Sequence, residues 1–115
     1  MSWNPEAARK QLEASVIARF KAEREKLSAW VVPSGRELAL AEENKQKVVI
    51  YLNRAPLHLP GALVEHTYQP SSVNAGRHSN LQLITDTLGF SYKAHRVKVT
   101  SSEALERLLF WYQYA

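Results

Sequence analysis

The sequence predicts an α+β domain in which a long N-terminal helix and a C-terminal helix pack on a three- to four-stranded, mostly antiparallel sheet. Apolar residues recur at helical spacing near both ends of the chain, and apolar, β-branched runs lie between them. The connections between those runs are short, which favours antiparallel pairing. Helices at both ends would then group on one face of the sheet.

The first helix is expected to begin at Asn4, a favourable N-cap, with Pro5 in the first turn. Its apolar stripe would extend over about seven turns and end before Pro33. The stripe consists of Leu12, Val16, Phe20, Leu27 and Trp30. Ser34 and Glu37 have the spacing of a capping box and predict a second helix to about Asn44. The alternation in residues 37–42 also fits a short strand.

Four strands are expected in the middle of the chain. Residues 48–52 form an uninterrupted apolar run, which is typical of a strand covered on both faces, and residues 62–68 alternate as a strand nearer an edge does. Residues 81–85 and 90–99 would pair as a hairpin, in which Gly89 supplies the positive φ of the connection.

The longest loop and the last helix complete the order of elements. Residues 69–80 collect Pro, Ser, Asn and Gly without an apolar period and predict a long loop. Ser and Thr at residues 100–102, followed by Glu103, offer caps for a closing helix. Its buried side would consist of Leu105, Leu108, Leu109 and Tyr112.

Composition places the chain in a broad class. Its 115 residues suit one domain, residues 1–115, and 45% hydrophobic with 23% charged residues is ordinary globular composition. The absence of cysteine removes disulfides and favours a cytoplasmic setting. No apolar run approaches the roughly 18 residues of a membrane span, so we expect no membrane partner. Without closely paired histidines or a glycine-rich phosphate loop, we expect no metal and no cofactor.

Positive charge is concentrated in the middle of the chain. The net charge is +4, and residues 54–100 contain five basic side chains against Glu65 and Asp86. On an extended strand, Tyr92, Arg96 and Lys98 would share one face. A face with cations beside a ring can bind phosphates and stack on bases, although a solvated face with the same pattern is more common.

These observations suggest a small basic nucleic-acid-binding module, with DNA preferred over RNA. Such a module would be a free-standing regulator or the specificity domain of a larger DNA-processing enzyme. The expected phosphate contacts are Arg54, Arg77, Lys93, Arg96 and Lys98. Bases would be contacted by Arg77, His78, Asn80 and Tyr92. Residues 77–80 also fit an ordinary polar loop.

Two other functions remain open. Phe110, Trp111, Tyr112 and Tyr114 suit a protein-binding inhibitor, an assembly subunit or a homodimer that uses the terminal helices, although core packing between those helices is the more common reason for such a cluster. His66, His78 and His95 would suit a metal-independent endoribonuclease only if they converged. Because scattered histidines are more often structural, we expect a binding protein more than an enzyme and assign no catalytic residue.

Overall fold

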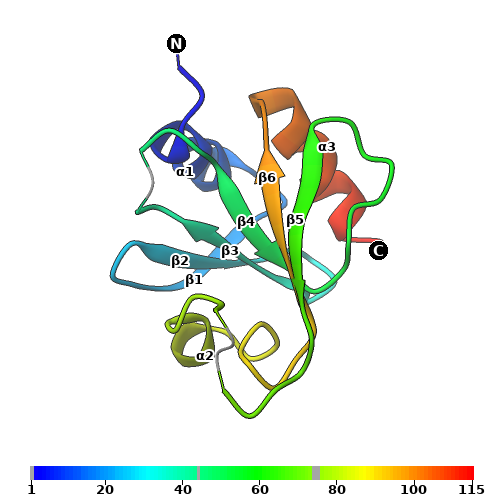
Figure 1. The fold of residues 1–115 in the computed structure, drawn as a ribbon. Coiled ribbons are helices and arrows are strands. Elements are labelled where there is room, and N and C mark those ends of the chain that lie inside the picture. The colour runs from blue at the N-terminus through cyan, green and yellow to red at the C-terminus, as the bar shows by residue number, and fades with distance from the viewer. Residues whose placement is uncertain (1, 44, 74–75) are drawn as a thin grey trace.

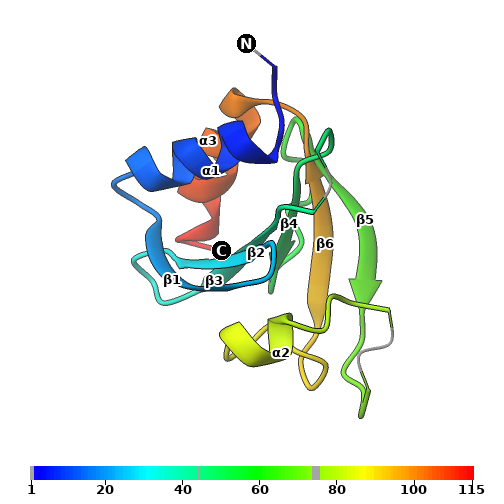
Figure 2. The same cartoon turned by 90° about the vertical axis from the view of Figure 1, so that its left-hand side faces the viewer.

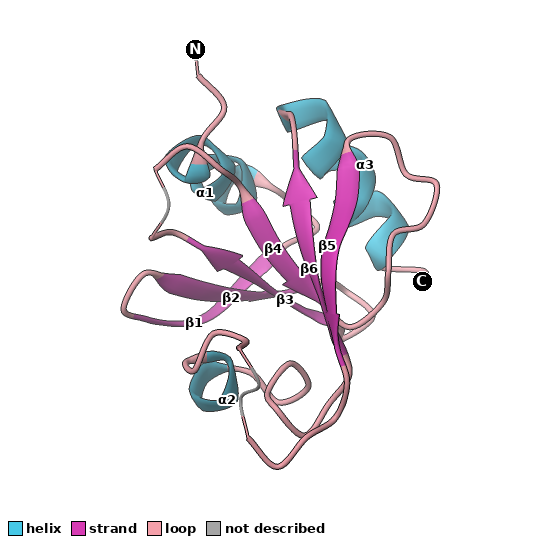
Figure 3. Cartoon of the chain, viewed as in Figure 1, coloured by secondary structure: helices cyan, strands magenta, loops and turns pink. Residues whose placement is uncertain are grey.

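The computed structural model describes residues 2–43, 45–73 and 76–115, and it is built around a six-stranded antiparallel sheet (Figures 1 and 3). The strand order is β1-β2-β3-β4-β6-β5. In chain order the elements are α1 (Pro5–Ala14), β1 (Arg19–Arg24), β2 (Leu27–Val31), β3 (Glu37–Ala41), β4 (Val49–Leu52), β5 (Ala62–Tyr68), α2 (Leu81–Ile84), β6 (Ala94–Val99) and α3 (Ser102–Tyr112). Within the described ranges, no helix has the length and apolar character needed to cross a bilayer.

The helices divide between the two faces of the sheet. Figure 2 shows α1 and α3 together on one side and α2 on the other. The larger core lies under α1 and α3 and includes Trp30, Ile50 and Tyr112. The smaller core lies on the α2 side and includes Tyr51 and Tyr68. The sheet is therefore the middle of three layers, and its central strands are buried on both faces.

The prediction of a long N-terminal helix is wrong beyond its first three turns. Asn4 caps α1 as expected, since its Oδ1 accepts a hydrogen bond from the Ala7 amide at 2.9 Å. The helix ends at Ser15, whose Oγ accepts from the Ile17 amide at 3.0 Å. Val16, which the helical stripe placed in the core, is exposed.

Residues 19–31 form a hairpin of β1 and β2 in place of helix. Glu25 and Lys26 both have positive φ, as the two central residues of a tight hairpin turn require. Phe20 and Trp30 meet across the hairpin with ring centroids 5.4 Å apart. The spacing that suggested one helical stripe instead places Trp30 in the larger core and Leu27 in the smaller one.

The second predicted helix is absent, and its residues form the strand β3. The alternating pattern of residues 37–42 had left this alternative open. All five residues of β3 are buried. Leu38 and Leu40 enter the larger core, whereas Ala39 and Ala41 enter the smaller one. Burial on both faces outweighs the helix propensity of Ala, Leu and Glu. The strands β1, β2 and β3 explain why the sheet has six strands, where we expected three or four.

The strands β4 and β5 and the helix α3 are confirmed close to their predicted bounds. The predicted hairpin of residues 81–99 is wrong in its first half, because residues 81–84 form α2 and the last strand begins at Ala94. Gly89 does not have the positive φ expected of it. A Cβ there would lie 3.1 Å from the Cα of Gln82, so close approach of α2 is the feature that requires glycine.

Candidate nucleic-acid interface

Two of the predicted phosphate contacts lie side by side on β6. Arg96 is paired with Tyr51 on β4 and with His66 on β5, while Lys98 is paired with Val49 and Leu63. Directly opposed residues point to the same face of a sheet. Since Tyr51 and Val49 belong to the smaller core, Arg96 and Lys98 both lie on the α2 side, as the alternation along β6 predicts.

A surface on the α2 side of β4, β6 and β5 surrounds these cations, and we call it the basic face. The helix α2 contacts β1 and β2, so it does not cover this part of the sheet (Figure 1). The side chains there are exposed or half-buried above Tyr51 and Tyr68. The basic face consists of Lys47, Leu63, Glu65, His66, Arg96 and Lys98.

Glu65 is the carboxylate of the basic face. It lies where the register of β5 shifts between Val64 and His66, and it pairs with Lys47 and with Nε of Arg96 at 3.3 Å. Burial alone would raise the pKa of Glu65, but the two cations hold it below its usual range. Lys98 has no ion pair with any residue in the described ranges. The three cations thus outnumber Glu65 and a second carboxylate, Glu43, whose charge acts on Tyr51 beneath the face, and the face remains positive.

Two buried tyrosines lie beneath the basic face. The rings of Tyr51 and Tyr68 have centroids 6.5 Å apart, and burial raises the pKa of the Tyr51 hydroxyl. Tyr51 is directly opposite Arg96 on β4. Burial alone would lower the pKa of Arg96, yet Tyr51 and Tyr68 help to raise it. The His66 ring packs against Tyr68 at 4.3 Å, so a buried ring supports His66 at the surface.

Arg77, expected to contact both phosphates and bases, is an internal anchor. Its side chain is 4% exposed and lies over the ring of Tyr68. One terminal nitrogen donates to the carbonyl oxygens of Leu88 (3.1 Å) and Tyr92 (2.8 Å). Further bonds go to the carbonyls of Gln69 and Gly89. The guanidinium holds the loop before α2 against the loop after it, and it does not reach the protein surface.

His78 and Asn80 are also engaged inside the protein. Nε2 of His78 lies 3.3 Å from a carboxylate oxygen of Glu43, and Nδ1 accepts from the Asn80 amide at 3.2 Å. The side chain of Asn80 donates to the carbonyl of Arg24 at 3.4 Å. The His78 contact joins the α2 region to the loop after β3, and the Asn80 bond joins it to the end of β1. Both residues border the α2 layer without belonging to the basic face.

The remaining predicted contacts are dispersed. Arg54 is exposed just after the last residue of β4, whereas Lys98 pairs with the first residue of that strand. Arg54 lies near Tyr112 of α3. Lys93 lies close enough to His95 for its charge, together with burial, to lower the pKa of that histidine, and His95 faces the α1 and α3 side. Tyr92 is 47% exposed in the loop before β6. Of the eight predicted residues, the structure therefore brings only Arg96 and Lys98 together on an open face.

The structure also adds cations that the sequence analysis missed. Lys47 precedes Val49 by two residues, so extending the alternation of β4 by one step would have placed it on the basic face. Arg24 is opposite Leu27 of the smaller core, which puts it on the same side of the sheet. Lys26 follows in the turn. Arg24 and Lys26 were missed because their segment was assigned to a helix.

The three histidines of the ribonuclease hypothesis do not converge. His66 lies on the basic face, whereas Nδ1 of His95 is 2.9 Å from Oγ1 of Thr67 on the other side of the sheet. Burial and the charge of Lys93 lower the pKa of His95. His78 is bound at Glu43. Among the described residues, no three His, Cys, Asp or Glu side chains are grouped so that they could hold a metal ion.

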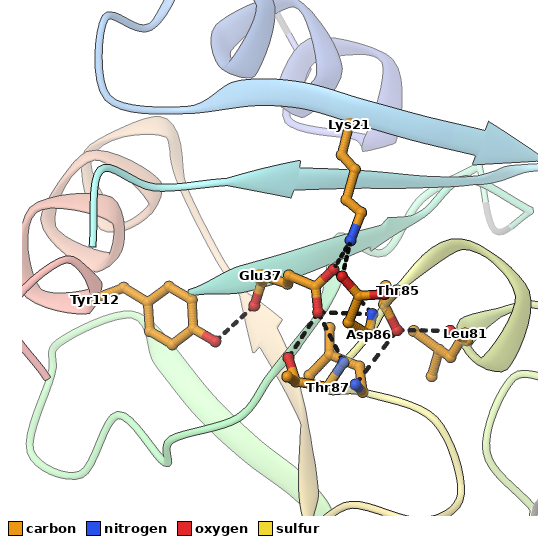
Figure 4. Close-up of polar contacts among 8 residues, drawn as sticks. Lys21, Glu37, Leu81, Thr85, Asp86, Thr87 and Tyr112 are labelled. Carbon is orange, nitrogen blue, oxygen red and sulfur yellow. Dashed lines mark hydrogen bonds and ion pairs between the residues drawn. The ribbon is translucent and has the colours of Figure 1, made fainter. Parts of the chain in front are cut away.

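A second polar cluster surrounds Glu37 and is drawn in Figure 4. Its buried carboxylate accepts from the amides of Asp86 and Thr87, both at 2.8 Å, and from Oγ1 of Thr87 at 2.7 Å. Lys21 pairs with Glu37 and, at 2.8 Å, with Asp86. Burial would raise the pKa of Glu37, but these donors lower it. The carboxylate is saturated by its own chain, so the cluster anchors the loop after α2. Its residues also line a surface pocket between β1, β3 and that loop, but the donors around Glu37 are already engaged within the protein.

Comparisons of the chain with protein-family models, with curated proteins and with solved structures found no match in any of the three.

Proposed function

We propose that the chain binds nucleic acid through the basic face. The observation that carries the proposal is the gathering of Lys47, Arg96 and Lys98 on one open sheet face, where Glu65 pairs with two of them. Clustered cations on one face are the electrostatic footprint of a protein that contacts phosphates. The absence of cysteine suits the cytoplasmic setting in which we expect it to act.

The spacing of the cations supports phosphate contact. Arg96 and Lys98 are two residues apart on one strand, which separates them by roughly 7 Å. Arg96 lies opposite Tyr51 on β4 and donates to Glu65 at 3.3 Å, so part of its side-chain freedom is already lost before binding.

Glu65 does not prevent this use of the face. Its side chain and those of Lys47 and Arg96 are all partly exposed, and such ion pairs contribute about 0–1 kcal/mol. A phosphate that approaches Arg96 can therefore replace Glu65 as its partner at small cost. A guanidinium carries five N–H donors, and Glu65 takes only the one on Nε.

The test measures binding of labelled single-stranded and duplex DNA and RNA by fluorescence anisotropy at about 50 and about 200 mM salt. The basic-face variant is Arg96→Gln/Lys98→Gln. The control, Arg54→Gln/Lys93→Gln, changes the net charge equally on exposed residues elsewhere. We expect the basic-face variant to bind more weakly and to flatten the slope of log K against log salt by about 1.4–1.8.

The control variant should bind almost as the wild type does. Equal losses in the two variants would overturn the proposal, because they would show that only net charge matters. Absence of binding to all four nucleic acids at low salt would overturn it as well.

A second candidate function is protein binding through the outer side of α3. Phe110 and Tyr114 are 62% and 75% exposed, and their rings contact each other at 5.8 Å. Tyr112, in contrast, is buried in the larger core. Exposed aromatic pairs are frequent in protein interfaces. Self-association that is insensitive to salt and lost in Phe110→Ser/Tyr114→Ser would favour this candidate; a monomer at all concentrations would remove its homodimer form.

A further inference from the structure

The basic face is built from strands, without a projecting helix. On the α2 side, the only helix within the described ranges is α2 itself, which has four residues and contacts β1 and β2. The longer helices α1 and α3 pack on the opposite face (Figure 2). The major groove of duplex DNA admits an α-helix or a two-stranded ribbon. The basic face presents no helix for such a groove.

The β1–β2 hairpin cannot serve as an inserting ribbon either. β2 is buried on both faces and is paired with β3 along its whole length. Only the turn at Glu25 and Lys26 extends beyond the sheet. The hairpin is thus an integral part of the sheet, and β3 lies between it and the basic face on β4, β6 and β5.

The basic face presents apolar and aromatic surface between its cations. Leu63 is 55% exposed opposite Lys98, and His66 is exposed opposite Arg96. The His66 ring is braced edge-on by Tyr68 at an interplanar angle of 62°. Unstacked bases bind on such rings and on apolar side chains while cations contact the backbone between them. Bases that are paired inside a duplex cannot reach this surface.

We infer that the basic face takes single-stranded nucleic acid in preference to a duplex, with phosphates at Arg96 and Lys98 and a base on His66. This inference rests on the proposed function of the same surface. The phosphates of one extended strand would follow β6, and the bases would turn toward the edge strand β5, where Leu63 and His66 are exposed.

The test compares one labelled oligonucleotide, single-stranded and annealed to its complement, in anisotropy titrations of wild type, His66→Ala and Tyr92→Ala. Tyr92 is an exposed aromatic residue outside the basic face and serves as the matched control. We expect the single strand to bind at least about tenfold more tightly than the duplex. His66→Ala should weaken single-strand binding roughly 5- to 100-fold, while Tyr92→Ala should leave it unchanged.

The outcomes separate the inference from the function on which it rests. Equal or tighter binding of the duplex, or an unchanged affinity in His66→Ala, would overturn the single-strand inference and leave nucleic-acid binding intact. Absence of binding to both forms would overturn the proposed function together with the inference. A melting temperature of His66→Ala equal to that of the wild type shows that weaker binding comes from lost stacking and not from unfolding of the variant.

Discussion

Replacing Arg77 with methionine tests whether this residue is an anchor or a ligand contact. Methionine retains a long, flexible stem but removes the donors that bind four main-chain carbonyls. The carbonyls of Leu88 and Gly89 are bonded in a buried environment, whereas those of Gln69 and Tyr92 are nearer to solvent and can turn toward water. A buried acceptor without a donor costs about 1–3 kcal/mol.

Two such acceptors give an expected loss of about 3 kcal/mol in the free energy of unfolding of Arg77→Met. The assay is urea denaturation followed by tryptophan fluorescence, in which the buried Trp30 reports on the core. With m of about 1–3 kcal/mol/M, the midpoint should fall by roughly 1–3 M. Arg77→Lys should lose most of the same stability, because one ammonium group cannot span carbonyls on both loops.

The matched control is Arg54→Met, which removes an exposed cation and should change the free energy of unfolding by less than about 0.5 kcal/mol. If Arg77→Met unfolded at the wild-type urea concentration, the anchoring role would be refuted. A fully stable Arg77→Met that no longer bound nucleic acid would instead restore the original assignment of Arg77 to the ligand.

Three further predictions concern buried polar groups. Glu37→Gln should lower the free energy of unfolding by about 2–3 kcal/mol at pH 7. Because the pKa of Glu37 is lowered by folding, this difference should persist above the ordinary carboxyl pKa and shrink as the pH falls through the folded value; a constant difference down to acidic pH would contradict it. Tyr112→Phe should cost about 1–2 kcal/mol in urea denaturation, since the hydroxyl donates to the Glu37 carbonyl and accepts from the Asn53 amide, and a neutral result would show these bonds to be dispensable. Folding also lowers the pKa of His95, so wild-type melting temperatures should fall as the pH drops below about 6.5, and His95→Gln should reduce that dependence; an unaltered pH profile would count against it.

The strands β4 and β5 and the helix α3 could be predicted because their patterns are unambiguous. The β-branched run at residues 48–52 and the alternation at residues 62–68 are compatible with strands alone. Residues 16–41 were misassigned, because spacings of three, four and seven also occur when a hairpin buries alternate residues in two cores. Ala, Leu and Glu in β3 favour helix locally, and only burial on both faces reverses that preference.

The candidate site was predicted in part for the same reason. Alternation along one strand was enough to place Arg96 and Lys98 on a common face. The burial of Arg77 was not predictable from its polar loop, because the carbonyls of Leu88, Gly89 and Tyr92 come from a segment that we assigned to a β-hairpin. Counting charges along the sequence therefore included Arg77, which is buried, in the positive patch and left out Lys47, which belongs to it.

The most direct test of the proposed interface is a map of amide chemical shifts as a short single-stranded oligonucleotide is added to ¹⁵N-labelled protein. Binding through the basic face predicts the largest changes at Lys47, His66, Arg96 and Lys98, with little change along α1 and α3. Changes concentrated on α3 or around Arg54, with the strands β5 and β6 unaffected, would contradict it.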